Sequence, residues 1–172
     1  MKDDRVSPWY ILDRRCREHW NEQAIWSRER SYTFGELSEQ VARYGQWMLD
    51  QGIRPKDLVA LYLQNCPEFM MIWFACLCIG AAPAFINYNL EGPALLHCLD
   101  VCESKLLIAD SEPSCRRRIE GSRAYIEEKG TTIVVLNGPL KQEISTRPAV
   151  VPGDEYRKGM QGSFPYCLIY TR

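Results

Sequence analysis

The side chains best suited to bind a metal or move a proton lie together at His97, Cys98 and Cys102. On a helix, Cys98 and Cys102 share one face, whereas His97 projects in another direction. A structural zinc site needs four donors, and two thiols with a misdirected imidazole do not form that tetrahedral shell. His97 also has no carboxylate or nucleophile placed beside it, so we expect a packed residue rather than a catalytic base. The sequence therefore predicts no metal site and no catalytic residue.

Two other places could contact a ligand. Asn87 follows an apolar run near the expected carboxyl end of a strand, where open α/β sheets place ligands. Together with Asn89 it is also suited to fix a turn, so a substrate-binding role and a structural role both stay open. Residues 116–118, three consecutive arginines, are the only dense basic cluster, which we interpret as a solvated helix face. The formal net charge of −1 predicts no nucleic-acid partner.

The composition is that of a globular protein. Hydrophobic residues make up 46% and charged residues 25% of a chain of 172 residues, which is enough for one domain with a core. The eight cysteines show no Cys-x-x-Cys spacing, and no apolar run near the N-terminus is as long as the core of a signal peptide. We therefore expect reduced, mostly buried cysteines in an intracellular protein.

Helical and extended patterns alternate along the chain. Helices are expected at residues 8–20, 33–51, 67–79, 93–102 and from about 110 to 128. A short hairpin is expected at 23–27 and 30–32, and strands at 58–63, 83–87, 105–109, 131–136 and 164–171. Strands that alternate with helices of this length indicate βαβ units, hence an α/β fold with a parallel sheet.

Local signals place several of these boundaries. Thr33 and Glu36 have the spacing of a capping box, and Gly52 is placed to end the helix that follows. Asn65 is expected to cap the next helix, with Glu68 at the capping-box position. Residues 137–163 show no periodicity and contain three prolines and four glycines, so a long loop is expected before the last strand.

Residues 69–86 contain no charged side chain and approach the length of a membrane span. Gly80 and Pro83 interrupt this run, so we interpret it as a buried helix followed by a buried strand. Peripheral membrane contact through the same surface stays open as an alternative.

Four stretches, taken in order, resemble one family. They are residues 31–37 (SYTFGEL), 58–69 (LVALYLQNCPEF), 79–90 (IGAAPAFINYNL) and 95–99 (LLHCL), and an Ile-Tyr-Thr strand follows them at 169–171. They are similar to the N-terminal part of adenylate-forming (AMP-binding) enzymes. The resemblance is to the branch of fatty acid transport proteins and very long-chain acyl-CoA synthetases, and it covers residues 20–171.

This resemblance implies a fold and an activity. Residues 1–172 would be part of an N-terminal adenylating domain with an incomplete parallel sheet. The family uses ATP, Mg²⁺ and coenzyme A to activate a fatty acid as an acyl-adenylate and then as a thioester. Thr171 matches the first residue of the family's phosphate loop, Thr-Ser-Gly-Thr-Thr-Gly-x-Pro-Lys, and Arg172 departs from it. We therefore expect a truncated chain that is inactive alone and needs no cofactor alone, with Thr171 a cofactor-binding residue and Asn87 a substrate-binding one.

Three interpretations are open at this point. The chain is an N-terminal piece of a fatty-acyl-CoA synthetase, or a non-catalytic module that associates with itself, a full-length relative or lipid, or an unrelated nucleotide-binding α/β domain. A remnant without function is a further alternative to the first. An incomplete sheet would leave the helix at residues 70–79 partly exposed, which predicts marginal stability. The family resemblance also suggests a peripheral location on endoplasmic reticulum, peroxisome or plasma membrane.

Overall fold

The computed structural model describes residues 7–159 and 164–170 of the chain. Its centre is a five-stranded parallel sheet with the strand order β6-β5-β3-β4-β7, and β1 and β2 form a separate antiparallel hairpin. The strands are β1 (Gln23–Trp26), β2 (Ser31–Thr33), β3 (Leu58–Tyr62), β4 (Ala82–Phe85), β5 (Leu106–Asp110), β6 (Thr132–Leu136) and β7 (Leu168–Ile169). The α/β fold with a parallel sheet is therefore confirmed.

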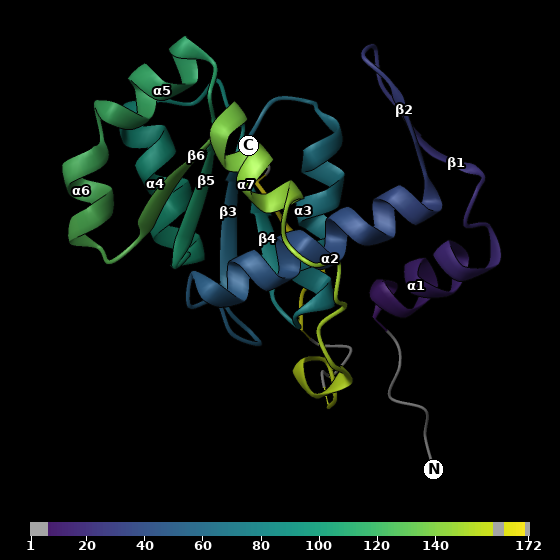
Figure 1. Cartoon of the computed structure of the whole chain (residues 1–172). Coiled ribbons are helices and arrows are strands. Elements are labelled where there is room, and N and C mark those ends of the chain that lie inside the picture. The colour runs from purple at the N-terminus through teal and green to yellow at the C-terminus, as the bar shows by residue number, and fades with distance from the viewer. Residues whose placement is uncertain (1–6, 160–163, 171–172) are drawn as a thin grey trace.

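Helices cover both faces of the sheet (Figure 1). One face packs against α1 (Pro8–Glu18), α2 (Phe34–Asp50), α3 (Pro67–Cys78) and α7 (Gly138–Ser145). The other face packs against α4 (Gly92–Cys102), α5 (Pro113–Glu120) and α6 (Arg123–Glu128). A short 3-10 helix, η1, spans Asp154–Tyr156.

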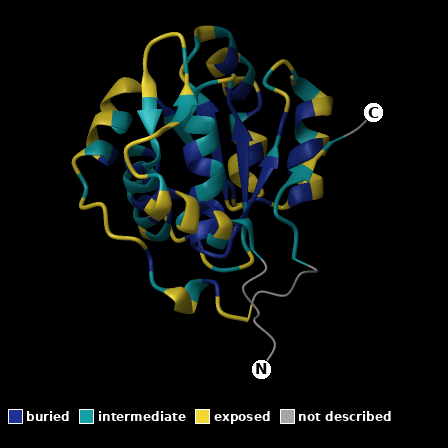
Figure 2. Cartoon of the chain, turned by 90° about the vertical axis from the view of Figure 1, so that its right-hand side faces the viewer, coloured by how far each residue is buried: buried dark blue, intermediate teal, exposed yellow. Residues whose placement is uncertain are grey.

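The apolar strands produce this three-layer arrangement because successive side chains of a strand point to opposite faces. In β3, Val59 and Leu61 join the core on the α2 and α3 side, while Ala60 and Tyr62 join the core on the α4 side. All four side chains are fully buried. Figure 2 shows the strands as the buried centre and the exposed residues on the outer sides of the helices. The continuous apolar pattern of 58–63 thus correctly predicted a strand covered on both faces.

Helix α2 begins and ends as its sequence predicts. The Thr33 hydroxyl accepts a hydrogen bond from the Glu36 backbone N–H at 3.2 Å, and the Glu36 carboxylate accepts one from the Thr33 N–H at 2.8 Å. At the other end Gly52 has a positive φ of 87°, which allows the Ile53 N–H to donate to the Met48 carbonyl at 3.0 Å. Both predicted ends are confirmed.

Two helix boundaries were predicted wrongly. The N-cap of α3 is Cys66 rather than Asn65, because Pro67 occupies the first helical turn and the Glu68 side chain pairs with Lys141 instead of the backbone. The single helix expected up to residue 128 is divided into α5 and α6. The break lies at Gly121 and Ser122, where Ser122 leaves the helical region with a ψ of 3°.

The expected long loop at residues 137–163 was wrong over residues 138–145 and 154–156, which are helical, while residues 146–153 and 157–159 contain no helix or strand. Asn137 caps α7 by accepting a hydrogen bond from the Leu140 N–H at 2.9 Å, and Pro139 lies in the first turn. Further along, residues 154–156 form η1. The glycines and prolines that indicated a loop here start a helix, because proline and an asparagine cap favour the first turn.

The last strand is shorter than the expected 164–171. Only Leu168 and Ile169 pair with β4, and upstream the Tyr166 carbonyl accepts a hydrogen bond from Trp73 Nε1 at 3.1 Å. Pro165 has no N–H for strand pairing. The expected partial exposure of residues 70–79 is limited to Met70, Trp73 and Phe74, because α2 packs over α3 and the other residues of this stretch are buried. Marginal stability stays a prediction.

Candidate functional site

The carboxyl ends of β3, β4, β5, β6 and β7 lie at one edge of the sheet because all five strands are parallel. Loops that leave this edge are where α/β proteins bind ligands. Asn87 follows β4 by two residues. β7 lies beside β4 with Ile169 opposite Phe85, and Thr171 follows Ile169 by two residues in the sequence. Thr171 itself lies outside the described residues.

Side chains from β3, α5 and the loop itself, together with the loop's own backbone, hold the loop at residues 87–91 in place. Asn87 Oδ1 accepts from the Asn89 N–H at 2.9 Å, which closes a turn. The Tyr62 hydroxyl, from β3, donates to the Leu90 carbonyl at 2.6 Å. Arg118 Nη1, from α5, donates to the Tyr88 carbonyl at 2.8 Å. The turn-fixing role expected of Asn87 is therefore confirmed, and its substrate role stays a prediction.

Arg118 differs in burial and contacts from the other two arginines of the basic cluster. The side chains of Arg116 and Arg117 are exposed, as a solvated helix face requires, whereas Arg118 is half-buried against the loop at residues 87–91. Arg118 Nε also lies 3.8 Å from the Glu91 carboxylate. Spacing alone did not indicate this role, because it depends on α5 lying beside the loop after β4.

The crevice between the carboxyl ends of β3 and β5 is closed by the protein's own side chain. Asp110 Oδ2 accepts from the Gln64 N–H at 3.0 Å, and Asp110 Oδ1 accepts from the Glu112 N–H at 2.9 Å. One carboxylate thus joins two neighbouring loops that lead to helices on opposite faces of the sheet. This is the position at which an open sheet of this type binds a ligand, and here an aspartate fills it.

Glu112 caps α5 immediately beyond this point. Its carboxylate accepts hydrogen bonds from the Ser114 hydroxyl and from the backbone N–H groups of Ser114 and Cys115, at 2.9 Å and 3.0 Å for the latter two. These bonds favour the charged form and lower the pKa of Glu112 to about 2. Asp110 and Glu112 therefore act on the backbone of this edge rather than on a ligand.

An open groove of about 590 Å³ lies between the β1–β2 hairpin, the N-terminus of α3 and α7. Lys141 Nζ lies 2.7 Å from Glu68 Oε1 at its base. Burial is the largest influence on the pKa of Lys141 and lowers it, but the hydrogen bond and the charge of Glu68, with smaller effects of Cys66 and Asp110, together raise the pKa. Arg28 and Glu29 add one charge of each sign. With two cations and two carboxylates, the groove has no net preference for a charged ligand.

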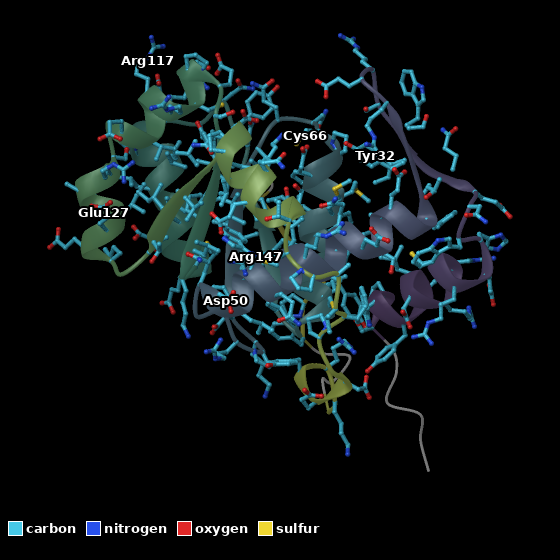
Figure 3. The ribbon with its side chains drawn as sticks, in the orientation of Figure 1. Tyr32, Asp50, Cys66, Arg117, Glu127 and Arg147 are labelled. Atoms are coloured by element: carbon cyan, nitrogen blue, oxygen red, sulfur yellow. The ribbon has the colours of Figure 1, made fainter. Side chains whose placement is uncertain are left out.

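A second groove of about 360 Å³ lies on the other side of the Glu68–Lys141 pair, against α2. Tyr32 and Tyr44 line it, and Tyr32 is labelled in Figure 3. Burial, and then Glu68, raise the pKa of Cys66 to about 11, so its thiol is a weak nucleophile. The sequence did not predict the Glu68–Lys141 pair because the two residues are far apart and α7 was not expected.

The remaining sulfur and imidazole groups form no site. No group of three or more His, Cys, Asp or Glu side chains is arranged to hold a metal ion within residues 7–159 and 164–170. No cysteine is paired in a disulfide among the described residues, which include all eight, and six of the eight are buried, which confirms that most of them are buried, while their reduced state stays a prediction. His97 is exposed on α4, so the expectation that it packs in the core was wrong.

Comparison with known proteins shows the family to which the chain belongs. The family described as AMP-binding enzyme matches residues 12–171. The chain belongs to this family. Relatives within the AMP-binding enzymes include isopenicillin N epimerase component 1 of Hapsidospora chrysogena, 33% identical over 80% of this chain and 23% of the relative. The very long-chain fatty acid transport protein of Cochliobolus heterostrophus is 32% identical over 75% of this chain and 20% of the relative. The chain thus spans about a fifth of the length of these relatives.

Solved structures of AMP-binding enzymes share the fold. A fatty acyl CoA synthetase of Mycobacterium tuberculosis superposes with a TM-score of 0.85 at 21% identity, covering 99% of this chain and 34% of that chain. The N-terminal domain of FACL13 from the same organism also gives 0.85 at 21%, covering 96% of this chain and 42% of that chain. Over the part of the sequence described by the structure, no helix has the length and apolar character needed to cross a membrane.

Proposed function

We propose that this chain forms the N-terminal portion of an ATP-dependent fatty-acyl-CoA ligase of the fatty acid transport protein branch. The observation that carries the proposal is the parallel pairing of β7 with β4, because the family match extends through β7 and the loop that carries Asn87 follows β4. The 32% identity with the Cochliobolus protein supports the fatty acid branch. Fatty acid and coenzyme A are the substrates that this proposal assigns to the whole enzyme.

The residues described here do not supply the machinery of that reaction. No glycine-rich loop follows β3, β4, β5 or β6, and no carboxylate cluster suited to Mg²⁺ lies among the described residues. A phosphate-binding loop needs backbone N–H groups that close on the phosphate oxygens. The proposed role of this chain is therefore to build the framework that positions such a loop, with Thr171 as its first residue and Asn87 beside it. The chain alone is proposed to be inactive.

An exchange assay tests this role. The chain and the full-length Cochliobolus relative are each incubated with ATP, labelled pyrophosphate and saturated fatty acids from medium to very long chain length. We expect exchange with the relative and none with the chain, since acyl-adenylate formation needs the phosphate loop. Exchange that follows the chain through purification, and that is lost with it on immunodepletion, would contradict the proposed inactivity.

A second candidate function has one specific observation in its favour. β7 is a two-residue edge strand, and the Ile169 side chain on it is 69% exposed. An open edge can add a strand from another chain, so a non-catalytic module that pairs with itself or with a full-length relative is the alternative. Light scattering after size-exclusion chromatography distinguishes the two candidate functions. A chain that stays monomeric, both alone and when mixed with the full-length relative, would count against the module.

The location is proposed from the same relatives. One of them is named a very long-chain fatty acid transport protein, and a long-chain fatty acid transport protein of Rattus norvegicus is 27% identical over 62% of this chain, which supports peripheral association with an intracellular or plasma membrane. Flotation of the chain with vesicles of phosphatidylcholine and phosphatidylserine tests this, with vesicle-free gradients as the control. We expect part of the chain to float, and its retention at the bottom of the gradient at every lipid concentration would oppose the proposal.

A further inference from the structure

The segment that follows α7 is fixed along α2 by hydrogen bonds. Residues 146–157, named the strap here, descend past α2 to η1 (Figure 1). Arg43 Nε donates to the Arg147 carbonyl at 3.0 Å, and Gln46 Nε2 donates to the Val150 carbonyl at 3.1 Å. Two side chains of α2 thus bind the backbone of the strap, which is why this segment holds one path without a strand or a helix over most of its length.

Arg157 ends the strap and is its most buried charged residue, with 7% of its surface exposed. Arg157 Nη1 donates to the Pro152 carbonyl at 2.9 Å and to the Cys78 carbonyl at the end of α3. The centre of its guanidinium lies 5.2 Å from the Trp9 ring and 5.9 Å from the Tyr10 ring of α1. One side chain therefore contacts the strap, α3 and α1 together.

Two further contacts close the same junction. The Tyr10 hydroxyl of α1 donates to Asp154 Oδ1 at 2.7 Å, and Asp154 lies 3.6 Å from Arg157 Nε. Gly80 follows α3 with a positive φ of 71°, and a Cβ at that position would overlap the Tyr156 carbonyl oxygen. Only glycine allows both this backbone conformation and this close approach.

We propose that the strap and α1 form one cooperative unit that opens and closes together through Arg157, while the sheet stays folded. A buried guanidinium is costly unless its donors stay paired with acceptors, and separation of α1 would remove the two aromatic rings that cover it. Opening of the strap would in turn leave the Cys78 and Pro152 carbonyls without their donor. This inference is independent of the proposed enzymatic function.

Hydrogen–deuterium exchange on the whole chain tests the unit, with Arg157→Ala against Arg147→Ala. Arg147 lies on the same strap, and its side chain pairs with Asp50 and Glu143 at the surface (Figure 3). For Arg157→Ala we expect exchange to rise by about tenfold or more both in α1 and at residues 152–157, since a buried charged donor is lost. For Arg147→Ala we expect a rise only near residue 147. β3 and β5 should keep their protection in both variants.

Two milder variants decide the matter if Arg157→Ala fails to fold. Arg157→Lys keeps the charge but replaces the planar guanidinium that bonds both carbonyls through Nη1. Tyr10→Phe removes the hydroxyl that donates to Asp154. Each should raise exchange in α1 and in the strap in parallel, by a smaller factor. Faster exchange of the strap with α1 unchanged would overturn the proposal, and so would an equal rise in β3 and β5, which would make Arg157 part of the global core.

Discussion

The centre of the sheet and its β4–β7 edge differ in how their loops are used. At the centre, four of the five residues of β3 and of β5 are buried, and Asp110 joins their loops. At the edge, β7 pairs over two residues only, Ile169 is exposed, and Asn87 lies at the surface of a firmly held turn. The loops at the centre are therefore tied to each other, whereas the β4–β7 edge is the more exposed part of the sheet. The central strands thus form a well-packed core, while the proposed binding edge is held by the two-residue pairing of β7 with β4.

The largest effect should come from a matched pair of truncations in the two regions. Leu61→Ala in β3 removes a side chain with 0% exposure and should lower the free energy of unfolding by about 2–5 kcal/mol. Ile169→Ala in β7 should cost no more than about 0.5 kcal/mol, because that side chain is exposed. Urea denaturation followed by circular dichroism measures both. Equal losses would remove the distinction between centre and edge.

The next comparison is between the stability contributions of two polar loop residues, Asp110 at the centre and Asn87 at the edge. Asp110→Ala leaves two backbone N–H groups without their acceptor and should cost about 1–3 kcal/mol. Asn87→Ala removes one bond of an exposed turn and should cost at most about 1 kcal/mol. Chemical denaturation of the two variants under one buffer condition gives the comparison. A larger loss at Asn87 than at Asp110 would mean that the edge, not the crevice, holds the domain together.

The pH dependence of stability tests how Glu112 stabilises the loop after β5. Its pKa is lowered from 4.5 to about 2, so its charged form stabilises the folded chain above pH 4.5, and this contribution is lost as the pH falls toward 2. Glu112→Gln should therefore differ most from the natural chain above pH 4.5 and converge with it below that value. Ser114→Ala, which removes one donor, should give a smaller change of the same sign. If the difference in free energy of unfolding between Glu112→Gln and the natural chain were the same at every pH, the lowered pKa of Glu112 would be contradicted.

Cysteine labelling should give the smallest difference. Cys76 is fully buried in α3, and Cys66 is half-buried at its N-terminus with a pKa raised to about 11. We expect iodoacetamide at neutral pH to label Cys66 slowly and Cys76 only after unfolding, because the thiolate is the reactive form. Peptide mass spectrometry over time measures both rates. Rapid labelling of Cys66 in the folded chain would require an activated thiol.

The centre could be predicted from the sequence because its signals are local. The apolar run at 58–63, the capping box at Thr33 and the positive φ expected at Gly52 each depend on a few neighbouring residues. Helix α7 had the same kind of signal in Asn137 and Pro139, but the glycines and prolines of the following residues outweighed it. Its Leu140 and Ile144 repeat on one face over only two turns, which is too short for periodicity to show.

The candidate site could be predicted only in part. Asn87 was placed correctly because its turn is formed with Asn89, two residues away. The contacts of Arg118 with Tyr88 and of Lys141 with Glu68 join residues from different elements, so no spacing rule indicates them. The same holds for Arg157, whose burial depends on α1, α3 and the strap meeting at one point.

The most direct test of the central claim is sequencing of the transcript through the codon for Thr171 and beyond. The account predicts a reading frame that continues into a glycine-rich phosphate loop, Ser-Gly-Thr-Thr-Gly, next to the β4–β7 edge. The chain would then be the N-terminal framework of a fatty-acyl-CoA ligase. A stop codon directly after Arg172 in every transcript would contradict that claim and would leave the non-catalytic module as the function to test.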